Sequence, residues 1–107
     1  MKGERLGEFE ELVLLSVRQL GDEAHGASVQ EVLAQLAGRE VTLGAIYAAL
    51  DRAQRTGMAE SWVGDPTPTR GGRAKRHYRV TSEGVEALEE SRRIRELLWA
   101  RPGEAQG

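Results

Sequence analysis

The segment Met58–Thr81, "MAESWVGDPTPTRGGRAKRHYRVT", decides the fold of this chain. Residues 58–63 alternate between two sets of side chains, and residues 75–81 hold aromatic and β-branched residues, so each run is typical of a short strand. Two prolines and two adjacent glycines between the runs exclude regular structure there. The segment therefore predicts a β-hairpin with a long loop at its tip.

The hairpin loop concentrates positive charge in a chain that is otherwise acidic. The 107 residues include 15 basic and 17 acidic side chains, which gives a net charge of −2. Residues 66–82 hold no acidic side chain and five basic ones: Arg70, Arg73, Lys75, Arg76 and Arg79. Phosphate groups attract such a cluster, and glycines let a backbone approach a duplex closely. We therefore expect nucleic-acid contact at this loop, and only there on grounds of charge.

Two helices are predicted near the start of the chain. Spacings of three and four define the buried face of the first, which ends at Gly21: Phe9, Leu12, Val13, Ser16, Val17 and Leu20. Leu14 and Leu15 lie outside that face, so we expect a second neighbour there, such as another subunit. In the second helix, Ser28 with Glu31 matches a capping box, with the helix beginning near Gly26.

The third predicted helix, "VTLGAIYAALDRAQRTG" at 41–57, has two distinct faces. Thr42 is a good N-cap and Gly57 a good residue just past the helix end. The face predicted to be buried comprises Ile46, Ala49, Leu50 and Ala53. The opposite face carries Gly44, Tyr47, Ala48, Asp51 and Arg55, with Arg52 beside it. Because most of these side chains are small, a large partner can approach that face closely.

A last helix is predicted to follow the hairpin, with Thr81 as its cap and Pro102 beyond its end. A weak heptad seam runs along it: Gly84, Ala87, Ser91, Ile94 and Leu98. Little of the chain is left to pack against this helix, so we expect it to dimerise. The predicted organisation is a domain over 6–81 and a dimerisation helix over 82–101.

The composition excludes several classes of function. Without cysteine there are no disulfides and no thiolate metal sites. His25 and His77 lack carboxylate or thiolate companions at ligand spacing, and no nucleophile–base pair is visible, so we expect no metal, no cofactor and no enzyme. The charged start of the chain is unlike a secretory signal, and no apolar run approaches the roughly 20 residues of a membrane span. A cytoplasmic protein without membrane contact is expected.

The order of the elements is that of a winged helix-turn-helix: three helices, a strand, a basic loop, a strand and a helix. The fold class is mainly α with a two-stranded hairpin, plus the C-terminal dimerisation helix. In such proteins the third helix enters the major groove of DNA and the hairpin reaches the flanking backbone.

Four segments resemble the PadR family of bacterial transcriptional regulators: "FEELVLLSV", "HGASVQEVL", "VTLGAIYAALDRAQRTGM" and "RGGRAKRHYRVTSEG". The resemblance covers roughly residues 6–88, and the single helix after Gly84 is similar to the short subclass of the family. It implies a homodimeric DNA-binding repressor held together by its first and last helices. Ala53 and Gln54 depart from the family pattern, which has a leucine and an acid there, and the prolines lengthen the wing.

Pattern and resemblance together give the expected site residues. The expected contacts to a pseudo-palindromic duplex are Thr42, Gly44, Tyr47, Ala48 and Arg52 from the helix, and Arg70, Gly71, Gly72, Arg73, Lys75 and Arg76 from the wing. Arg52 has the alternative of pairing with Asp51 or Glu60. The expected dimer interface comprises Phe9, Leu14, Leu15, Ala87, Ser91, Ile94 and Leu98.

Alternatives remain open for the last helix and for the function. Trp99 anchors the helix end in the dimer interface or, as the resemblance implies, lines a cavity for a small aromatic effector. The alternatives to a repressor are an activator, a winged-helix module that binds protein instead of DNA, and a ligand sensor that acts through the dimer interface.

Overall fold

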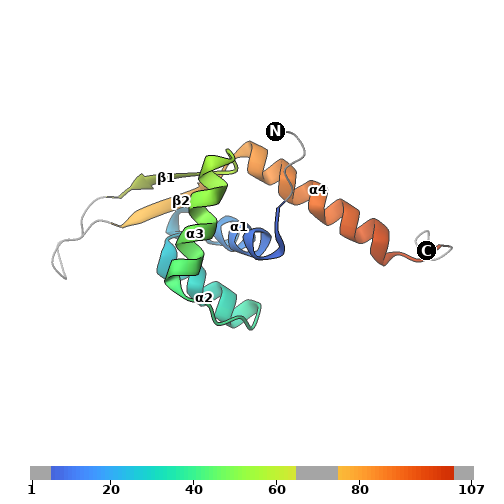
Figure 1. The fold of residues 1–107 in the computed structure, drawn as a ribbon, viewed down its shortest axis with the longest axis horizontal. Coiled ribbons are helices and arrows are strands. Elements are labelled where there is room, and N and C mark those ends of the chain that lie inside the picture. The colour runs from blue at the N-terminus through green and yellow to red at the C-terminus, as the bar shows by residue number, and fades with distance from the viewer. Residues whose placement is uncertain (1–5, 65–74, 103–107) are drawn as a thin grey trace.

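The computed structural model describes residues 6–64 and 75–102 and confirms the predicted fold class. Three helices form one body, an antiparallel hairpin leaves it on one side, and a long last helix leaves it on the other (Figure 1). In chain order the elements are α1 (Glu8–Leu20), the short 3₁₀ helix η1 (Gly21–Glu23), α2 (Gly26–Leu36), α3 (Leu43–Arg55), β1 (Ala59–Val63), β2 (Arg76–Val80) and α4 (Ser82–Trp99). None of the described helices is long and apolar enough to cross a membrane.

Two threonines set the start of the helices that flank the hairpin. The Thr42 side chain accepts a hydrogen bond from the backbone N–H of Ala45 at 3.1 Å, and α3 begins at the next residue. The Thr81 side chain accepts one from Gly84 at 3.0 Å, which fixes the start of α4 in the same way. Both caps are as predicted, because capping depends on contacts within one turn of the chain.

The predicted start of α2 near Gly26 is confirmed, but the cap of the helix differs from the prediction. The helix begins at Gly26, and the Ser28 hydroxyl accepts a hydrogen bond from the N–H of His25 at 2.9 Å. The same hydroxyl donates to the carbonyl of Glu23 at 2.7 Å. The predicted capping box of Ser28 with Glu31 is therefore wrong: Ser28 lies inside the first turn, where it ties the helix to the preceding loop.

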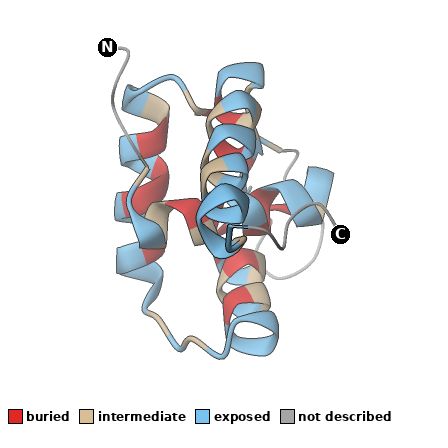
Figure 2. Ribbon diagram, turned by 90° about the vertical axis from the view of Figure 1, so that its right-hand side faces the viewer, coloured by how far each residue is buried: buried red, intermediate tan, exposed pale blue. Residues whose placement is uncertain are grey.

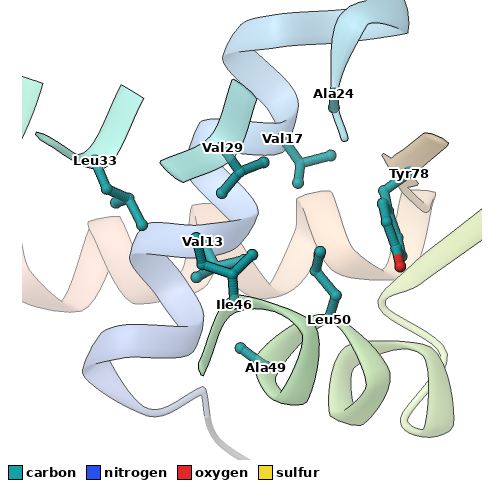
Figure 3. Close-up of a cluster of buried hydrophobic side chains, with 9 residues drawn as sticks. All are labelled: Val13, Val17, Ala24, Val29, Leu33, Ile46, Ala49, Leu50 and Tyr78. Carbon is teal, nitrogen blue, oxygen red and sulfur yellow. The ribbon is translucent and has the colours of Figure 1, made fainter. Parts of the chain in front are cut away.

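The main core lies where the three helices and β2 meet. Figure 3 shows its nine side chains: Val13, Val17, Ala24, Val29, Leu33, Ile46, Ala49, Leu50 and Tyr78. Ile46 and Leu50 are fully buried, as the predicted inner face of α3 requires. Each such side chain contributes about 1.5–3 kcal/mol to folding. The inner face of α3 is thus fully packed within its own chain, so the opposite face of the helix points away from the core.

The hairpin pairs in a register that gives it two different faces. Ala59 pairs with Val80 and Val63 with Arg76, so alternate residues point toward α3 and away from it. Tyr78 lies on the inner face, and its N–H donates to the carbonyl of Ala24 at 3.0 Å. The hairpin is therefore attached to the helical body by a backbone hydrogen bond as well as by side-chain packing.

A second, smaller buried cluster attaches α4. It comprises Leu14, Ala53, Ala59 and Leu88. Leu14 has no exposed surface, so it packs within its own chain and cannot contact a second subunit as expected from the sequence. Beyond Leu88 most of α4 is exposed (Figure 2). Within α4 only Gly84 and Leu88, in its first two turns, are buried.

Candidate nucleic-acid interface

The outer face of α3 is open and made of small side chains. Gly44 and Ala48 are exposed, and a Cβ added at Gly44 would meet nothing closer than the Thr42 hydroxyl at 4.0 Å. Asp51 and Arg55 follow on the same face and form an ion pair with each other one turn apart. The first two turns therefore offer a nearly smooth surface, and the third turn carries a neutralised pair.

Tyr47 stands at one edge of this face and is 45% exposed. Its hydroxyl lies directly above Gly26, so closely that a Cβ at Gly26 would overlap the hydroxyl oxygen. The phenol therefore rests on the first turn of α2, whose leading N–H groups have no carbonyl partner within the helix. The sequence predicts Tyr47 as a contact but assigns no role to Gly26. The signal for Gly26 is a glycine at the first position of a helix, where no turn requires one.

Arg52 stands at the other edge of α3, toward α1. Its Nε lies 3.4 Å from the carboxylate of Glu10, a side chain that is largely buried. Neither of the partners weighed from the sequence is used, since Asp51 pairs with Arg55 and Glu60 with Arg79. The partner of Arg52 comes from a helix distant in sequence, which local spacing does not reveal.

A shallow groove of about 630 Å³ runs between α3 and the hairpin. Its lining is formed by Tyr47, Ala48, Asp51, Gln54, Arg76 and Tyr78. Burial raises the pKa of the Tyr78 phenol, so this group stays neutral at physiological pH. Arg76 donates to the Ser61 hydroxyl at 2.9 Å, which holds its cation at the rim of the groove. The sequence predicts both Arg76 and Tyr47 as contacts, but it does not predict that they line one groove.

The root of the wing exposes Lys75 and Arg76, while four further expected contacts, Arg70, Gly71, Gly72 and Arg73, lie outside the described residues. Arg79 is differently placed, on the far face of the hairpin. It pairs with Glu60 at 2.8 Å and lies 5.0 Å above the ring of Trp62. Its charge is therefore used within the hairpin.

Two histidines pack where the wing meets the body. His77 stacks on Trp62 with ring centroids 5.5 Å apart, and its Nδ1 donates to the carbonyl of Asp22 at 3.0 Å. His25 meets His77 edge-on at 6.1 Å, although the two are 52 positions apart in sequence. Burial, followed by the charge of Lys75, lowers the pKa of His25. Within 6–64 and 75–102 no three potential ligand side chains gather in a way that could hold a metal.

A second surface of interest lies on α4 and α1. Leu98 is 81% exposed and Trp99 88%, and the neighbouring Leu97 is exposed as well. Leu15 on α1 is also exposed, whereas Phe9 is half-buried against the main core. The remaining expected interface residues, Ala87, Ser91 and Ile94, are half-buried along α4. Large apolar side chains without cover in a single chain are typical of a protein–protein contact.

Comparison with known proteins agrees with this geometry. The model of the transcriptional regulator PadR-like family matches residues 13–90. No curated protein sequence matches the chain.

Solved structures with the same fold include a PadR family transcriptional regulator from Eggerthella lenta, with 25% identity, a TM-score of 0.67, and 84% of this chain and 73% of that one covered. A transcriptional regulator from Clostridium thermocellum has 19% identity, a TM-score of 0.68 and 83% coverage of both chains. Bacillus subtilis PadR in complex with operator DNA has 19% identity and a TM-score of 0.66, over 78% of this chain and 45% of that one.

The matched family consists of transcriptional regulators and not of enzymes, and its model spans α2, α3, the hairpin and much of α1 and α4. This chain belongs to the PadR-like family of transcriptional regulators.

Proposed function

We propose that the protein binds duplex DNA as a homodimer and represses transcription, in the cytoplasm, from a pseudo-palindromic operator. The observation that carries this proposal is the outer face of α3, which is smooth, exposed and flanked by the cationic root of the wing. A face of this kind fits the major groove, where a helix must approach base edges closely. That a solved structure of the same fold holds operator DNA supports the proposal.

In this arrangement α3 enters the major groove and the wing follows the adjacent backbone. Gly44 and Ala48 permit the close approach, and Thr42 presents the start of the helix to a phosphate. Tyr47, whose hydroxyl lies above the start of α2, offers that hydroxyl as a donor to a second phosphate. Arg52 uses Nε for Glu10, which leaves its two terminal nitrogens as donors to the DNA backbone.

The wing supplies the cations that this face of α3 lacks. Arg76 is held at the groove rim, Lys75 is exposed beside it, and Arg70 and Arg73 extend the same charge along the chain. Because Asp51 is neutralised by Arg55, the third turn of α3 repels phosphate less than a free carboxylate would. Positive charge is therefore placed for the backbone and small side chains for the bases.

Dimerisation is assigned to α4 and α1. The exposed Leu98 and Trp99 would be covered by a second copy, whose apolar surface on α1 includes Leu15. In this proposal residues 6–81 form the DNA-binding domain, with α1 adding to the interface, and residues 82–101 form the dimerisation helix. Trp99 is 88% exposed in the single chain, so an aromatic effector at Trp99 would need a cavity formed with the second subunit.

The test measures DNA affinity at several salt concentrations, using duplexes selected from random DNA. Affinity is expected to fall steeply with salt, since each phosphate contact releases counterions. Replacing Arg70 and Arg73 together by alanine should reduce the slope of log affinity against log salt by about 2. The control is Arg93→Ala with Arg101→Ala, which removes the same charge from the α4 end and should leave the slope unchanged.

A wild-type protein that binds no duplex at low salt contradicts the proposed function and favours the protein-binding module. A wing variant with the same slope as the wild type contradicts the role of the wing alone. A monomer by light scattering at micromolar concentration contradicts the dimer.

A further inference from the structure

The direction of α4 depends on few contacts. Its first turns are fixed, since Gly84 packs so closely on the carbonyl of Met58 that a Cβ would overlap the oxygen, and Leu88 lies in the second cluster. Past Leu88 the helix is mostly exposed. In the described part of the chain, the hydrogen bonds and ion pairs that join residues 89–99 of α4 to another element all go to one side chain, Glu11 of α1.

Glu11 holds α4 with both of its carboxylate oxygens. Oε2 accepts a hydrogen bond from the Ser91 hydroxyl at 3.0 Å, and Oε1 accepts one from Nη2 of Arg95 at 2.7 Å. Ser91 and Arg95 lie one helical turn apart, so the carboxylate spans a full turn of α4. The Glu11 side chain is only 10% exposed. A carboxylate held in this way, largely out of water, makes stronger and more directional bonds than a surface ion pair.

The carboxylate is itself fixed in the domain. Its neighbours on α1, Val13 and Leu14, are buried in the main core and in the second cluster. Helix α1 therefore cannot follow a movement of α4 without disturbing both clusters. Leu88 and Glu11 act as two separate points of attachment, and two points determine the tilt of a rod.

We infer that Glu11 is a positioning residue which, through Ser91 and Arg95, sets the separation of the two DNA half-sites that a dimer recognises. The inference rests on the proposed function. In a dimer joined through α4, the tilt of this helix against the domain determines the distance between the two copies of α3. From Leu88 to Trp99 the helix is about 16 Å long. A tilt of roughly 10° moves its end by about 3 Å, close to the rise of one base pair.

Operator spacing mirrors the geometry of the dimer in helix-turn-helix proteins. A rigid tilt therefore gives a sharp preference for one spacing, and a loosened tilt gives a broad one. Affinity for a single half-site depends on α3 and the wing, so it should not change. This difference separates positioning from a general loss of structure.

The experiment uses the full chain and inverted repeats of a half-site obtained by selection from random duplexes. The spacer is lengthened and shortened by one and two base pairs. The main variant is Arg95→Met, which keeps the apolar stem of a side chain that is 61% exposed and so leaves the fold intact. The preference for the best spacing over its neighbours should fall by about tenfold, the worth of one charged hydrogen bond. Glu11→Gln should also weaken the preference for the best spacing. Arg95→Lys, which keeps the positive charge, should retain most of the wild-type preference.

Arg93→Met is the matched control. Arg93 lies on the same helix and pairs at 2.9 Å with Glu90, a residue of α4 itself, so its loss should leave the spacing profile of the wild type. An unchanged profile in both Arg95→Met and Glu11→Gln would overturn the inference while leaving the proposed function standing. Dissociation of Arg95→Met into monomers would overturn it as well, because positioning leaves association intact. A wild type that binds no duplex would overturn the proposed function first.

Discussion

The two ends of the molecule expose different chemistry, although each is built on a helix that begins with a capping threonine. At the winged end, α3 buries Ile46, Ala49, Leu50 and Ala53 among its 13 residues and exposes mainly small or paired side chains. At the other end, α4 buries only Gly84 and Leu88 among 18 residues and exposes Leu97, Leu98 and Trp99. The hairpin and α4 extend in opposite directions from the body (Figure 1).

The difference shows what each end lacks. At the winged end the inner face of α3 is buried and its outer face carries mostly small or charged side chains, so a partner there gains from close approach and charge. At the α4 end Leu97, Leu98 and Trp99 are 63%, 81% and 88% exposed, so a partner there gains from covering apolar surface. Exposure alone does not distinguish a DNA surface from a protein surface; the size and polarity of the exposed side chains do.

The largest expected effect compares a leucine from each end. Leu50→Ala should lower the free energy of unfolding by about 2–5 kcal/mol, because it leaves a cavity in the main core. This loss should be the same at every protein concentration. Leu98→Ala should instead make the melting temperature less dependent on concentration, since the side chain is covered only in the proposed dimer and a weaker dimer adds less stability as concentration rises. Thermal unfolding at two concentrations measures both, and equal concentration dependence in the two variants would remove the distinction between the ends.

A glycine from each end gives an intermediate effect. Gly84→Ala places a methyl group against the Met58 carbonyl, so α4 must shift and the free energy of unfolding should fall by about 1–3 kcal/mol. Gly44→Ala meets open space and should raise helix stability by up to about 1 kcal/mol. The same change should weaken DNA binding, because the added methyl group lies on the outer face of α3. Urea denaturation and gel-shift titration check the pair; a Gly44→Ala protein with unchanged DNA affinity would argue against close approach at this turn.

The smallest expected effect is a pH dependence confined to the winged end. Folding lowers the pKa of His25 below its ordinary value of 6.5, chiefly by burial. The unfolded chain therefore binds a proton more readily than the folded one, and stability should fall as the pH drops from about 6.5 through the lower pKa of the folded state. His25→Asn, which keeps a good N-cap residue for α2, should reduce this fall. Urea midpoints at pH 7.5 and pH 5 provide the measurement, and an equal fall in the variant would assign the acid sensitivity to other groups.

Much of this architecture follows from short-range sequence rules. The caps at Thr42 and Thr81, the four buried residues of α3 and the two strands all depend on neighbours within a few positions, and the structure confirms them. The resemblance to PadR regulators, carried by the runs around Tyr47 and Tyr78, is confirmed by the family match.

What the sequence did not reveal depends on contacts between distant residues. Leu14 lies outside the buried face predicted for α1, yet Leu88 of α4 covers it from the other side. Arg52 pairs with Glu10, and Tyr47 rests on Gly26; in each case the two residues belong to different helices. Periodicity says which side of a helix is apolar, but it does not say which element covers that side or which charge lies opposite.

The placement of the two tryptophans has a practical consequence. Trp62 is enclosed between an imidazole and a guanidinium at the base of the wing, whereas Trp99 stands in solvent at the tip of α4. These are the only two tryptophans in the sequence, and the elements that carry them, β1 and α4, lie on opposite sides of the body (Figure 1). Fluorescence of the unlabelled protein therefore contains two separable signals: a blue shift of Trp99 would report the proposed dimer, and unstacking of Trp62 reports melting of the hairpin. With one indole replaced by phenylalanine at a time, each end can be followed optically without a dye.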